Sequence, residues 1–385
     1  MITYRKARPA DRNAYIDFIN MVFSMVREPH DFKTLLPKVY ADGRETDAFQ
    51  NIAVDEAGRV TGVVAVKPDD MRVMDTTLKT GFVGSVSVHP YARGQGHMKA
   101  LMRMAIETAM ADGTDLLVLG GQRQRYEYFG FSKAGGALEY MVTRANLRHT
   151  YGDADFSGYS FVPVDEAAPA LIDAAWALYD ARPVGIVRSR EDFTLILKSW
   201  SAQPFVILRD GCFAGYLVAS QDHEQLTEIL LKDFADMGPM LMAWFALQGV
   251  HRVHITASPC DAVQNAVLAA FAERWKLGCC KQMRVMNFPK VVLAFMRQKD
   301  ALTPLREGAL CLWIDGKPLT LQKRGDACEA MEVAPDDAPR LTAMQAQTLL
   351  FSPLGAIAGL NGALCPSIPA GWLPLPFYMS AADCF

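Results

Sequence analysis

The sequence predicts a mixed α/β chain of the α+β type, arranged as successive units of strands and helices. Residues 83–131 have the pattern of a strand, a glycine-bearing turn, a helix and a second strand. A similar order of helices and strands returns between residues 165 and 274. After residue 299, short apolar runs surround Asp-Gly and Gly-Asp turns, which is typical of short antiparallel strands.

The composition is that of a globular protein long enough for two or three domains. The 385 residues are 51% hydrophobic and carry a formal net charge of −3, so neither nucleic acid nor an anionic membrane is indicated as a partner. All 8 cysteines follow residue 211, and none forms a Cys-x-x-Cys pair. We therefore expect reduced thiols, no metal site and a cytoplasmic location. Neither a signal-peptide layout nor an apolar run of membrane-spanning length is seen.

The elements before the turn follow from apolar alternation, helical spacing and turn residues. They are a strand over residues 2–7, a helix over residues 12–25 with Asp11 as a candidate cap, hairpin strands over residues 51–55 and 60–66, and a strand over residues 83–88. A helix over residues 98–111 and a strand over residues 116–119 follow the turn.

The turn itself suits an anion. Pro90 precedes Arg93-Gly94-Gln95-Gly96, and the helical pattern begins directly afterwards. The N–H groups at a helix start lack partners and carry partial positive charge, so they attract phosphate. The two glycines leave room for an anion at the backbone, and Arg93 adds a cation. The plain alternative is an ordinary connection with a surface arginine.

Two motifs carry a resemblance to a known family. Arg93-x-x-Gly96-x-Met98 resembles the coenzyme A pyrophosphate loop, Gln/Arg-x-x-Gly-x-Gly/Ala, of the GCN5-related N-acetyltransferases (GNAT), with Met98 where Gly or Ala is usual. Tyr126-Glu127-Tyr128-Phe129-Gly130-Phe131 is similar to the Tyr-x-x-Phe/Tyr-Gly-aromatic segment of the enhanced-intracellular-survival (Eis-like) acetyltransferases. The resemblance implies acetyl-coenzyme A (acetyl-CoA) as the co-substrate and no metal.

The resemblance also implies a domain organisation. Residues 1–148 would form the catalytic GNAT domain, and residues 149–298 a second, degenerate GNAT-like domain that lacks the Arg-x-x-Gly turn. Residues 299–385 would form a sterol-carrier-like α+β domain. The polar stretch of residues 144–158 is the expected boundary, and residues 299–307 are the expected linker.

By the same resemblance, the strand at Val86 and Val88 splays from its neighbour and offers backbone amides to the thioester carbonyl, with the two side chains in the core. The His97 ring is either a phosphate ligand or an ordinary surface residue. The diphosphate would be held by the Arg93 side chain and by the backbone amides of the loop, namely those of Gly94, Gln95, Gly96, His97 and Met98.

Two residues are candidates for proton transfer. Tyr126 is the candidate general acid, because a phenol with a reference pKa of about 10 can protonate a leaving thiolate; the alternative is a packed aromatic ring. Phe385 ends the sequence, and the resemblance implies that its α-carboxylate reaches the active site as the base. The alternative for Phe385 is a frayed chain end. Glu28 is a weaker candidate for contact with a cationic substrate.

Two functions from different classes stay open. The first is an N-acetyltransferase that moves an acetyl group from acetyl-CoA directly to a primary amine, either an aminoglycoside-like polyamine or a lysine side chain, in a ternary complex. The absence of cysteine before residue 212 argues against an acyl-cysteine intermediate there. The second is a sensor that binds acyl-CoA or an apolar ligand without turnover. The resemblance further implies a homo-oligomer, for example a hexamer.

Overall fold

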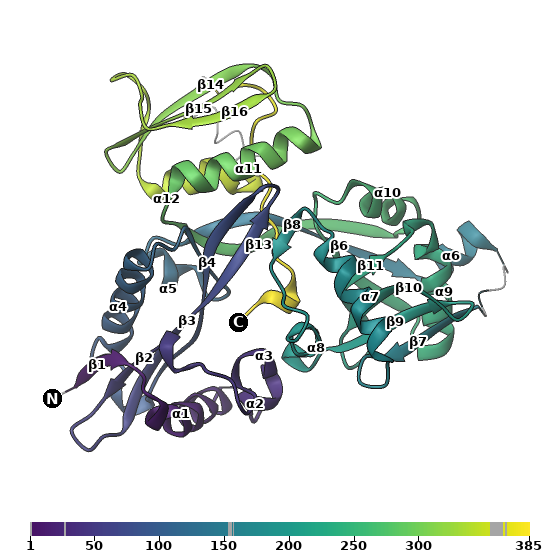
Figure 1. Cartoon of the computed structure of the whole chain (residues 1–385), viewed down its shortest axis with the longest axis horizontal. Coiled ribbons are helices and arrows are strands. Elements are labelled where there is room, and N and C mark those ends of the chain that lie inside the picture. Colours follow the sequence, from purple (N-terminus) through teal and green to yellow (C-terminus); the bar gives the residue numbers. More distant parts are fainter. Residues whose placement is uncertain (1, 27, 153–155, 157, 355–364, 366–367) are drawn as a thin grey trace.

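The computed structural model of the chain describes residues 2–26, 28–152, 156, 158–354, 365 and 368–385. Within these residues the strands form a 13-stranded sheet and a 4-stranded sheet, with helices packed on both (Figure 1). The strands are β1 Thr3–Lys6, β2 Gln50–Val54, β3 Val60–Val73, β4 Thr76–Val88, β5 Leu116–Leu119, β6 Ser132–Thr143, β7 Tyr159–Pro163, β8 Val184–Ile186, β9 Gln203–Arg209, β10 Cys212–Ala219, β11 Gln225–Leu231, β12 Arg252–Ala257, β13 Arg274–Val285, β14 Gly308–Ile314, β15 Lys317–Arg324, β16 Ala327–Met331 and β17 Arg340–Leu341.

The α-helices surround the two sheets, and none of those described is long and apolar enough to cross a lipid bilayer. They are α1 Arg12–Ser24, α2 Phe32–Leu35, α3 Pro37–Tyr40, α4 His97–Ala111, α5 Arg123–Glu127, α6 Arg144–Tyr151, α7 Pro169–Asp180, α8 Phe193–Leu197, α9 Met237–Gln248, α10 Ala262–Phe271, α11 Phe288–Leu302 and α12 Ala343–Phe351.

The large sheet runs in the order β1-β2-β3-β4-β5-β13-β6-β12-β11-β10-β9-β7, with β8 paired to β3. β4 and β5 pair in parallel, because α4 carries the chain back across the sheet between them. Helix α4 buries Leu101, Met102 and Ala105, which share one face at helical spacing. This crossover places the start of α4 next to the end of β4, where the glycine-bearing turn lies.

Two long strands join the halves of the large sheet. β13 lies between β5 and β6, and β6 lies between β13 and β12. A strand from late in the chain therefore completes the sheet of the first part, and a strand from the first part enters the sheet of the second. The two parts cannot separate without breaking the hydrogen-bond ladders of both strands.

The strands β3 and β4 are each longer than the sequence predicted, and they form a hairpin with each other. β3 continues to Val73 rather than ending at residue 66, and β4 begins at Thr76 rather than at residue 83. Lys67 and Asp69 interrupt the apolar alternation, but they form an ion pair with each other on one face of the strand. The polar run therefore stays in the ladder, with Asp69 opposite Thr80.

Two smaller expectations were wrong, and a third stays a prediction. The stretch of residues 144–158, predicted as a domain boundary, contains α6, whose start is capped by the Thr143 side chain. Residues 299–302 are the last turn of α11 and not a linker. The Asp11 side chain does not cap α1; it accepts a hydrogen bond from the Arg8 backbone and forms an ion pair with Arg5.

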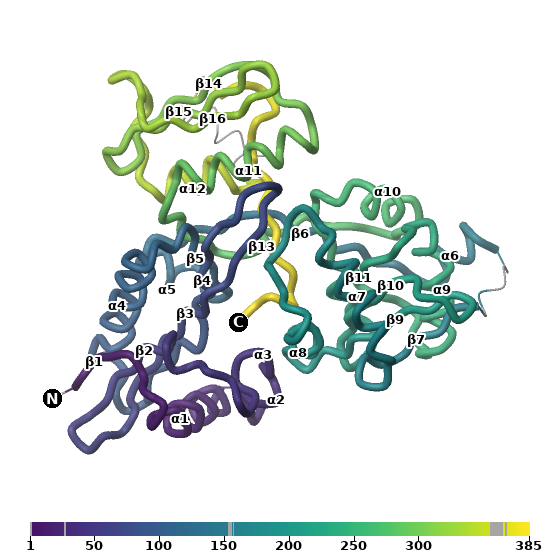
Figure 2. Tube along the Cα trace, in the orientation of Figure 1, coloured from purple at the N-terminus to yellow at the C-terminus, as the bar shows by residue number. Residues whose placement is uncertain are grey.

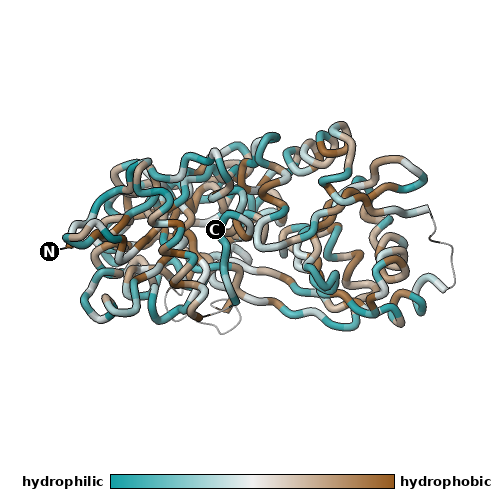
Figure 3. Tube along the Cα trace, turned by 90° about the horizontal axis from the view of Figure 1, so that it is seen from below, coloured by the Kyte–Doolittle hydropathy of each residue, from teal (hydrophilic) through white to brown (hydrophobic). Residues whose placement is uncertain are grey.

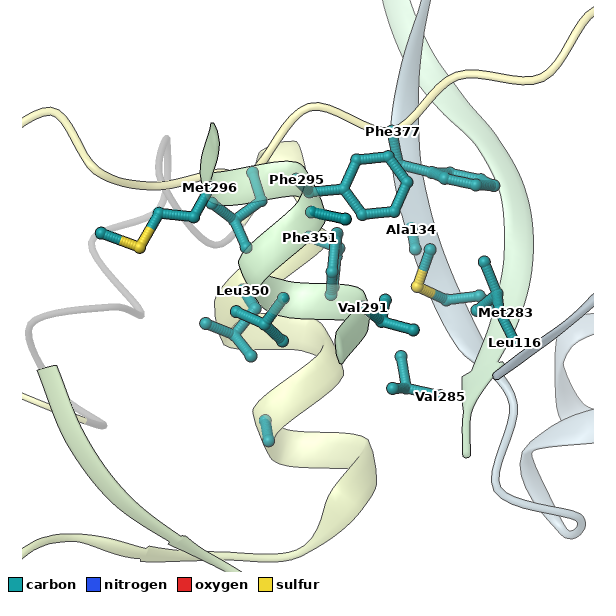
Figure 4. Packing of buried hydrophobic residues seen from close by; sticks show 14 of the residues in the cluster. Leu116, Ala134, Met283, Val285, Val291, Phe295, Met296, Leu350, Phe351 and Phe377 are labelled. Atoms are coloured by element: carbon teal, nitrogen blue, oxygen red, sulfur yellow. The ribbon is translucent and has the colours of Figure 1, made fainter. Parts of the chain in front are cut away.

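The small sheet is tied to the large one by a shared hydrophobic core. Phe295 of α11 and Phe351 of α12 meet edge to face at 5.6 Å and pack with Leu116 of β5, Met283 of β13 and Phe377 (Figure 4). Because one buried cluster includes residues from both sheets, the small sheet, α11 and α12 pack firmly against the first part of the large sheet.

The last residues of the chain return to the middle of the molecule. Residues 368–385 leave the small sheet and run between the two parts of the large sheet to Phe385 (Figure 2). Seen from below, the C-terminus lies near the middle of the long axis, and hydrophobic segments run through the interior on both sides of it (Figure 3). The Phe377 carbonyl accepts a hydrogen bond from the Gly136 N–H at 3.0 Å. A Cβ on Gly135 would lie 2.4 Å from that carbonyl oxygen, so glycine is needed where this segment crosses β6.

Candidate active site

A gap opens in the large sheet at the carboxyl end of β4. The parallel pairing of β4 with β5 ends at Val83 opposite Leu119, although β4 continues to Val88. The ladder with β3 shifts register just beyond this point, and Ser85 takes a positive φ of 50° there. The Ser85 hydroxyl is held by the buried Tyr40 hydroxyl at 2.7 Å. Backbone groups of β4 beyond Val83 therefore have no partner strand on the β5 side within the described ladders.

Val86 and Val88 lie at this gap, but their side chains are only half-buried, whereas those of Ser85 and Ser87 are buried. The two valines are therefore less buried than the core positions predicted for them. The register shift explains the difference, because an extra residue in β4 changes which side chains face inward.

The turn after β4 is open, and the backbone N–H groups that lead into α4 have no hydrogen-bond partner among the residues that the structure describes. Gly94 and Gly96 have φ values of 80° and 85°, and a Cβ on either would have no heavy atom within 4 Å. α4 begins at His97, and its first carbonyl bond is from the Ala100 N–H to Gly96. Arg93 is exposed, and within the described residues its side chain has no ion-pair partner. These features fit a diphosphate held by backbone amides and one cation.

The side chains of His97 and Met98 at the end of the turn pack against the protein instead of extending into solvent. The His97 side chain is 4% exposed, and its Nδ1 lies 2.7 Å from the Tyr4 hydroxyl. The ring therefore faces β1 rather than solvent, and the backbone amide is the part of His97 that remains for a ligand. Met98 packs inward against the cluster that contains Tyr126, so its side chain does not fill the turn.

Tyr126 follows the carboxyl end of β5 and lies in α5. Its side chain is 6% exposed, packs with Val83 and Val86, and meets Phe131 in a T-shaped contact at 6.4 Å. A Cβ on Gly121 would lie 2.6 Å from the Tyr126 ring, so glycine at that position gives the ring its space. Burial raises the pKa of Tyr126. The phenol therefore stays protonated at neutral pH, as a general acid requires.

Phe385 lies on the opposite face of the same strand. Phe82 and Gly84 share one face of β4, while Val83 and the Tyr126 cluster share the other. The Phe385 ring lies 6.5 Å from the Phe82 ring and occupies the space where a Gly84 side chain would be, since a Cβ there would lie 2.2 Å from its Cδ1. Tyr126 and Phe385 thus lie on the two faces of the sheet at the gap.

A buried ionic cluster holds the segment that leads to Phe385. Arg188 is fully buried and donates to both carboxylate oxygens of Glu228 at 2.8 Å and to Asp383 at 2.7 Å. The hydroxyls of Tyr216 and Ser380 also donate to Glu228. Burial opposes the charged form of Glu228, but the charge and hydrogen bonds of Arg188 outweigh it and lower the pKa of Glu228 to about 2.

Two further hydrogen bonds fix the last backbone carbonyls. Lys38 donates from Nζ to the Ala382 carbonyl at 2.6 Å, and the Trp200 indole donates to the Cys384 carbonyl at 3.3 Å. Burial lowers the pKa of Lys38 to about 8. Sequence reasoning missed Arg188, Glu228 and Lys38, and no local motif marks them. Glu28, the weaker candidate, is exposed after α1.

The packing of Phe385 on Gly84 gives a direct prediction. Gly84→Ala should push the ring out of its place and lower turnover at least about tenfold, because small displacements of reacting groups are costly. The affinity of the turn for a diphosphate-bearing substrate should change little, since Gly84 precedes the turn. Gly278→Ala is the matched control, because a Cβ there meets no heavy atom within 4 Å. Equal steady-state rates for Gly84→Ala and Gly278→Ala would contradict the assignment.

The comparison with known proteins identifies the first part of the chain. Residues 3–134 match the sequence model of the acetyltransferase (GNAT) domain. These residues form a GNAT domain. The match includes the gap, the turn at Arg93 and Tyr126, and GNAT enzymes use acetyl-CoA as their co-substrate. The GNAT domain therefore supports acyl transfer as the general chemistry of the site.

Solved structures extend the likeness beyond the GNAT domain, although no curated protein matches the chain in sequence. The chain is similar to a GCN5-related N-acetyltransferase from Kribbella flavida (16% identity, TM-score 0.67) and to one from Anabaena variabilis ATCC 29413 (14%, 0.70). It is also similar to Eis1 from Mycobacterium abscessus (13%, 0.65). Each match covers 100% of both chains, so the fold is shared along the whole length, and the resemblance to Eis1 is confirmed at the level of the fold.

Proposed function

We propose that the protein is an N-acetyltransferase that moves an acetyl group from acetyl-CoA directly to a primary amine in a ternary complex. The observation that carries the proposal is the gap beyond Val83, which has Tyr126 on one face and Phe385 on the other. In this proposal Arg93 and the amides from Gly94 to Met98 hold the diphosphate. The amides of Val86 and Val88 donate to the thioester carbonyl oxygen as negative charge develops on it.

The proposed transfer conserves atoms and charge. The amine nitrogen forms a bond to the carbonyl carbon, and the carbon–sulfur bond breaks. The α-carboxylate of Phe385 accepts the proton that the nitrogen loses, directly or through water, and the Tyr126 hydroxyl donates a proton to the leaving thiolate. After the products leave, the Phe385 carboxyl group releases its proton to solvent and Tyr126 takes one up from solvent, which restores both groups.

The surroundings of Phe385 favour a neutral amine. Burial lowers the pKa of Lys38, which lies against the Ala382 carbonyl, to about 8. An acceptor amine that enters the same desolvated region would lose its proton more readily for the same reason. A primary amine, carried by an aminoglycoside-like polyamine or by a lysine side chain, is therefore the proposed acceptor class.

A single-group change tests the base. In protein that ends at Phe385, the α-carboxylate can be converted to a primary amide. This change removes the negative charge of the group and leaves the packing of the phenylalanine ring unchanged. Turnover at neutral pH should fall roughly 10- to 100-fold and recover in part at higher pH, where solvent deprotonates the amine. The same turnover for the amide and the carboxylate would remove Phe385 from proton transfer and leave Tyr126 and the loop in place.

The function itself is tested by release of free coenzyme A thiol with a panel of polyamines, together with mass spectrometry of the amine product. Amine-dependent thiol release with one added acetyl group per product supports the transferase. Tight binding of acetyl-CoA without transfer to any amine would contradict it and favour a sensor of acyl-CoA.

The organisation of the chain belongs to the same proposal. We assign residues 1–148 to the catalytic domain, residues 149–298 to a degenerate GNAT-like domain, and residues 299–385 to a sterol-carrier-like domain. The element order around β9 to α10 and the small sheet of β14 to β17 support these assignments. A cytoplasmic homo-oligomer, for example a hexamer, is the proposed state; sedimentation analysis would test the assembly.

A further inference from the structure

The register shift in β4 is a bulge that decides where one backbone amide of the proposed site points. Where β3 has the single residue Val64, β4 has Ser85 and Val86. A bulge of this kind turns the backbone groups beside it away from the regular ladder. The Val86 N–H is one of the two amides assigned above to the thioester carbonyl, so its direction affects how well it stabilises the developing charge.

The bulge requires an uncommon backbone conformation. Ser85 has a φ of 50°, in the left-handed region where the Cβ of an L-residue crowds the backbone. Glycine adopts this region freely, but a serine stays there only when its surroundings hold it. The contacts of Ser85 should therefore account for the shape of the bulge.

A buried tyrosine supplies the first of these contacts. Tyr40, the last residue of α3, is 2% exposed, and its hydroxyl lies 2.7 Å from the Ser85 hydroxyl. The Gln50 side chain, at the start of β2, is fully buried and donates from Nε2 to the Tyr40 hydroxyl at 3.1 Å. The Tyr40 ring packs with Phe32 and Phe385, at 5.8 and 6.0 Å between ring centroids. Hydrogen bonds through Tyr40 thus connect β2 and α3 to the bulge.

A second contact fixes the direction of the amide. The Ser87 hydroxyl donates to the Ser85 carbonyl oxygen at 3.0 Å, and both serines are buried. The Ser85 carbonyl and the Val86 N–H belong to one planar peptide group, so they point in opposite directions. A carbonyl held on one side therefore aims the Val86 N–H toward the other side.

We propose that Tyr40 is a positioning residue for the acetyl transfer. Through Ser85 it keeps the bulge in the shape that aims the Val86 N–H at the thioester carbonyl. This role rests on the function proposed above. The Tyr40 hydroxyl is enclosed by Gln50 and Ser85, so it acts through Ser85 and not by contact with a substrate.

Steady-state kinetics of three variants test the proposal. Tyr40→Phe removes the hydroxyl and keeps the ring. Its kcat should fall by about tenfold or more, because a displaced donor stabilises the developing charge less, while the KM for acetyl-CoA should change by less than about twofold. Ser85→Ala loses the same hydrogen bond and keeps a Cβ, so its kcat should fall similarly. Ser85→Gly, added to Tyr40→Phe, should restore kcat to within about threefold of the unchanged protein, since glycine needs no support at this φ.

Tyr15→Phe is the matched control. The Tyr15 side chain is buried in the same hydrophobic cluster as Tyr40, but its hydroxyl bonds to Thr46 and Asp47 and not to the bulge. Tyr15→Phe should keep the kcat of the unchanged protein, even where it lowers stability as much as Tyr40→Phe does.

Three results would overturn the positioning role. They are a Tyr40→Phe protein that turns over as fast as Tyr15→Phe, a double variant that stays as slow as Tyr40→Phe, and equal kcat values for Ser85→Ala and Ser85→Gly. The last comparison decides the matter if Tyr40→Phe does not fold.

Failure of the proposed function would give a different result, because the unchanged protein would then release no coenzyme A thiol with any amine. Hydrogen exchange tests the role of Tyr40 without turnover. The backbone amides of residues 84–88 should exchange faster in Tyr40→Phe than in Tyr15→Phe, since the ladder beside the bulge loosens. Equal exchange in the two variants would show that Tyr40 does not hold the bulge.

Discussion

Tyr126→Phe is expected to lower kcat by roughly 100- to 10,000-fold, the contribution typical of a positioned general acid, while acetyl-CoA binds as before. The loss of one oxygen leaves the ring in the cluster with Val83 and Val86, so the fold should be preserved. Stopped assays of thiol release at saturating substrates measure the effect. Because burial raises the pKa of Tyr126, the alkaline fall of kcat in the unchanged protein should lie above pH ~10.

Tyr128→Phe is the matched control for this variant. The Tyr128 side chain is exposed, its hydroxyl accepts from Arg103 at 3.2 Å, and its ring lies under Lys99. Its loss should leave kcat nearly unchanged. A Tyr126→Phe protein that turns over as fast as Tyr128→Phe would show that the leaving thiolate takes its proton elsewhere.

Arg188→Met should destabilise the protein by about 3–5 kcal/mol, because it leaves Glu228 and Asp383 buried without their cation. The segment at Asp383 should loosen, so that turnover falls more than acetyl-CoA affinity does. Denaturant unfolding and steady-state kinetics measure the two effects. Adding Glu228→Gln and Asp383→Asn to Arg188→Met removes the unpaired charges and should restore much of the stability.

Arg190→Met provides the comparison, since its ion pair with Asp173 is largely solvent-exposed and should be worth less than about 1 kcal/mol. An Arg188→Met protein as stable as Arg190→Met would mean that the buried cluster does not hold the C-terminal segment.

The local parts of the site could be predicted from the sequence. The turn at Arg93, the helix after it and β5 over residues 116–119 depend on short-range signals, namely glycine, helical spacing and an apolar run. The structure places them within one residue of the prediction. The same signals indicated that Tyr126 belongs to an aromatic segment, but not that its ring packs beside Val86 at the gap.

The long-range parts could not be predicted. Glu228 and Asp383 lie 40 and 195 positions from Arg188, so no window of sequence contains their cluster. The exchange of β6 and β13 between the two halves depends on strand pairing, which a repeated element order does not reveal. The lengths of β3 and β4 were underestimated because the Lys67–Asp69 ion pair satisfies charges that otherwise indicate a loop.

The account depends on a thioester that lies in the gap between β4 and β5, within reach of Tyr126. A crystal structure with bound coenzyme A measures this directly. We predict the diphosphate against the amides that begin α4 and the sulfur within hydrogen-bond distance of the Tyr126 hydroxyl, beyond Val83. A sulfur bound on another surface, or a Tyr126 hydroxyl still enclosed by the cluster and out of its reach, would contradict the account.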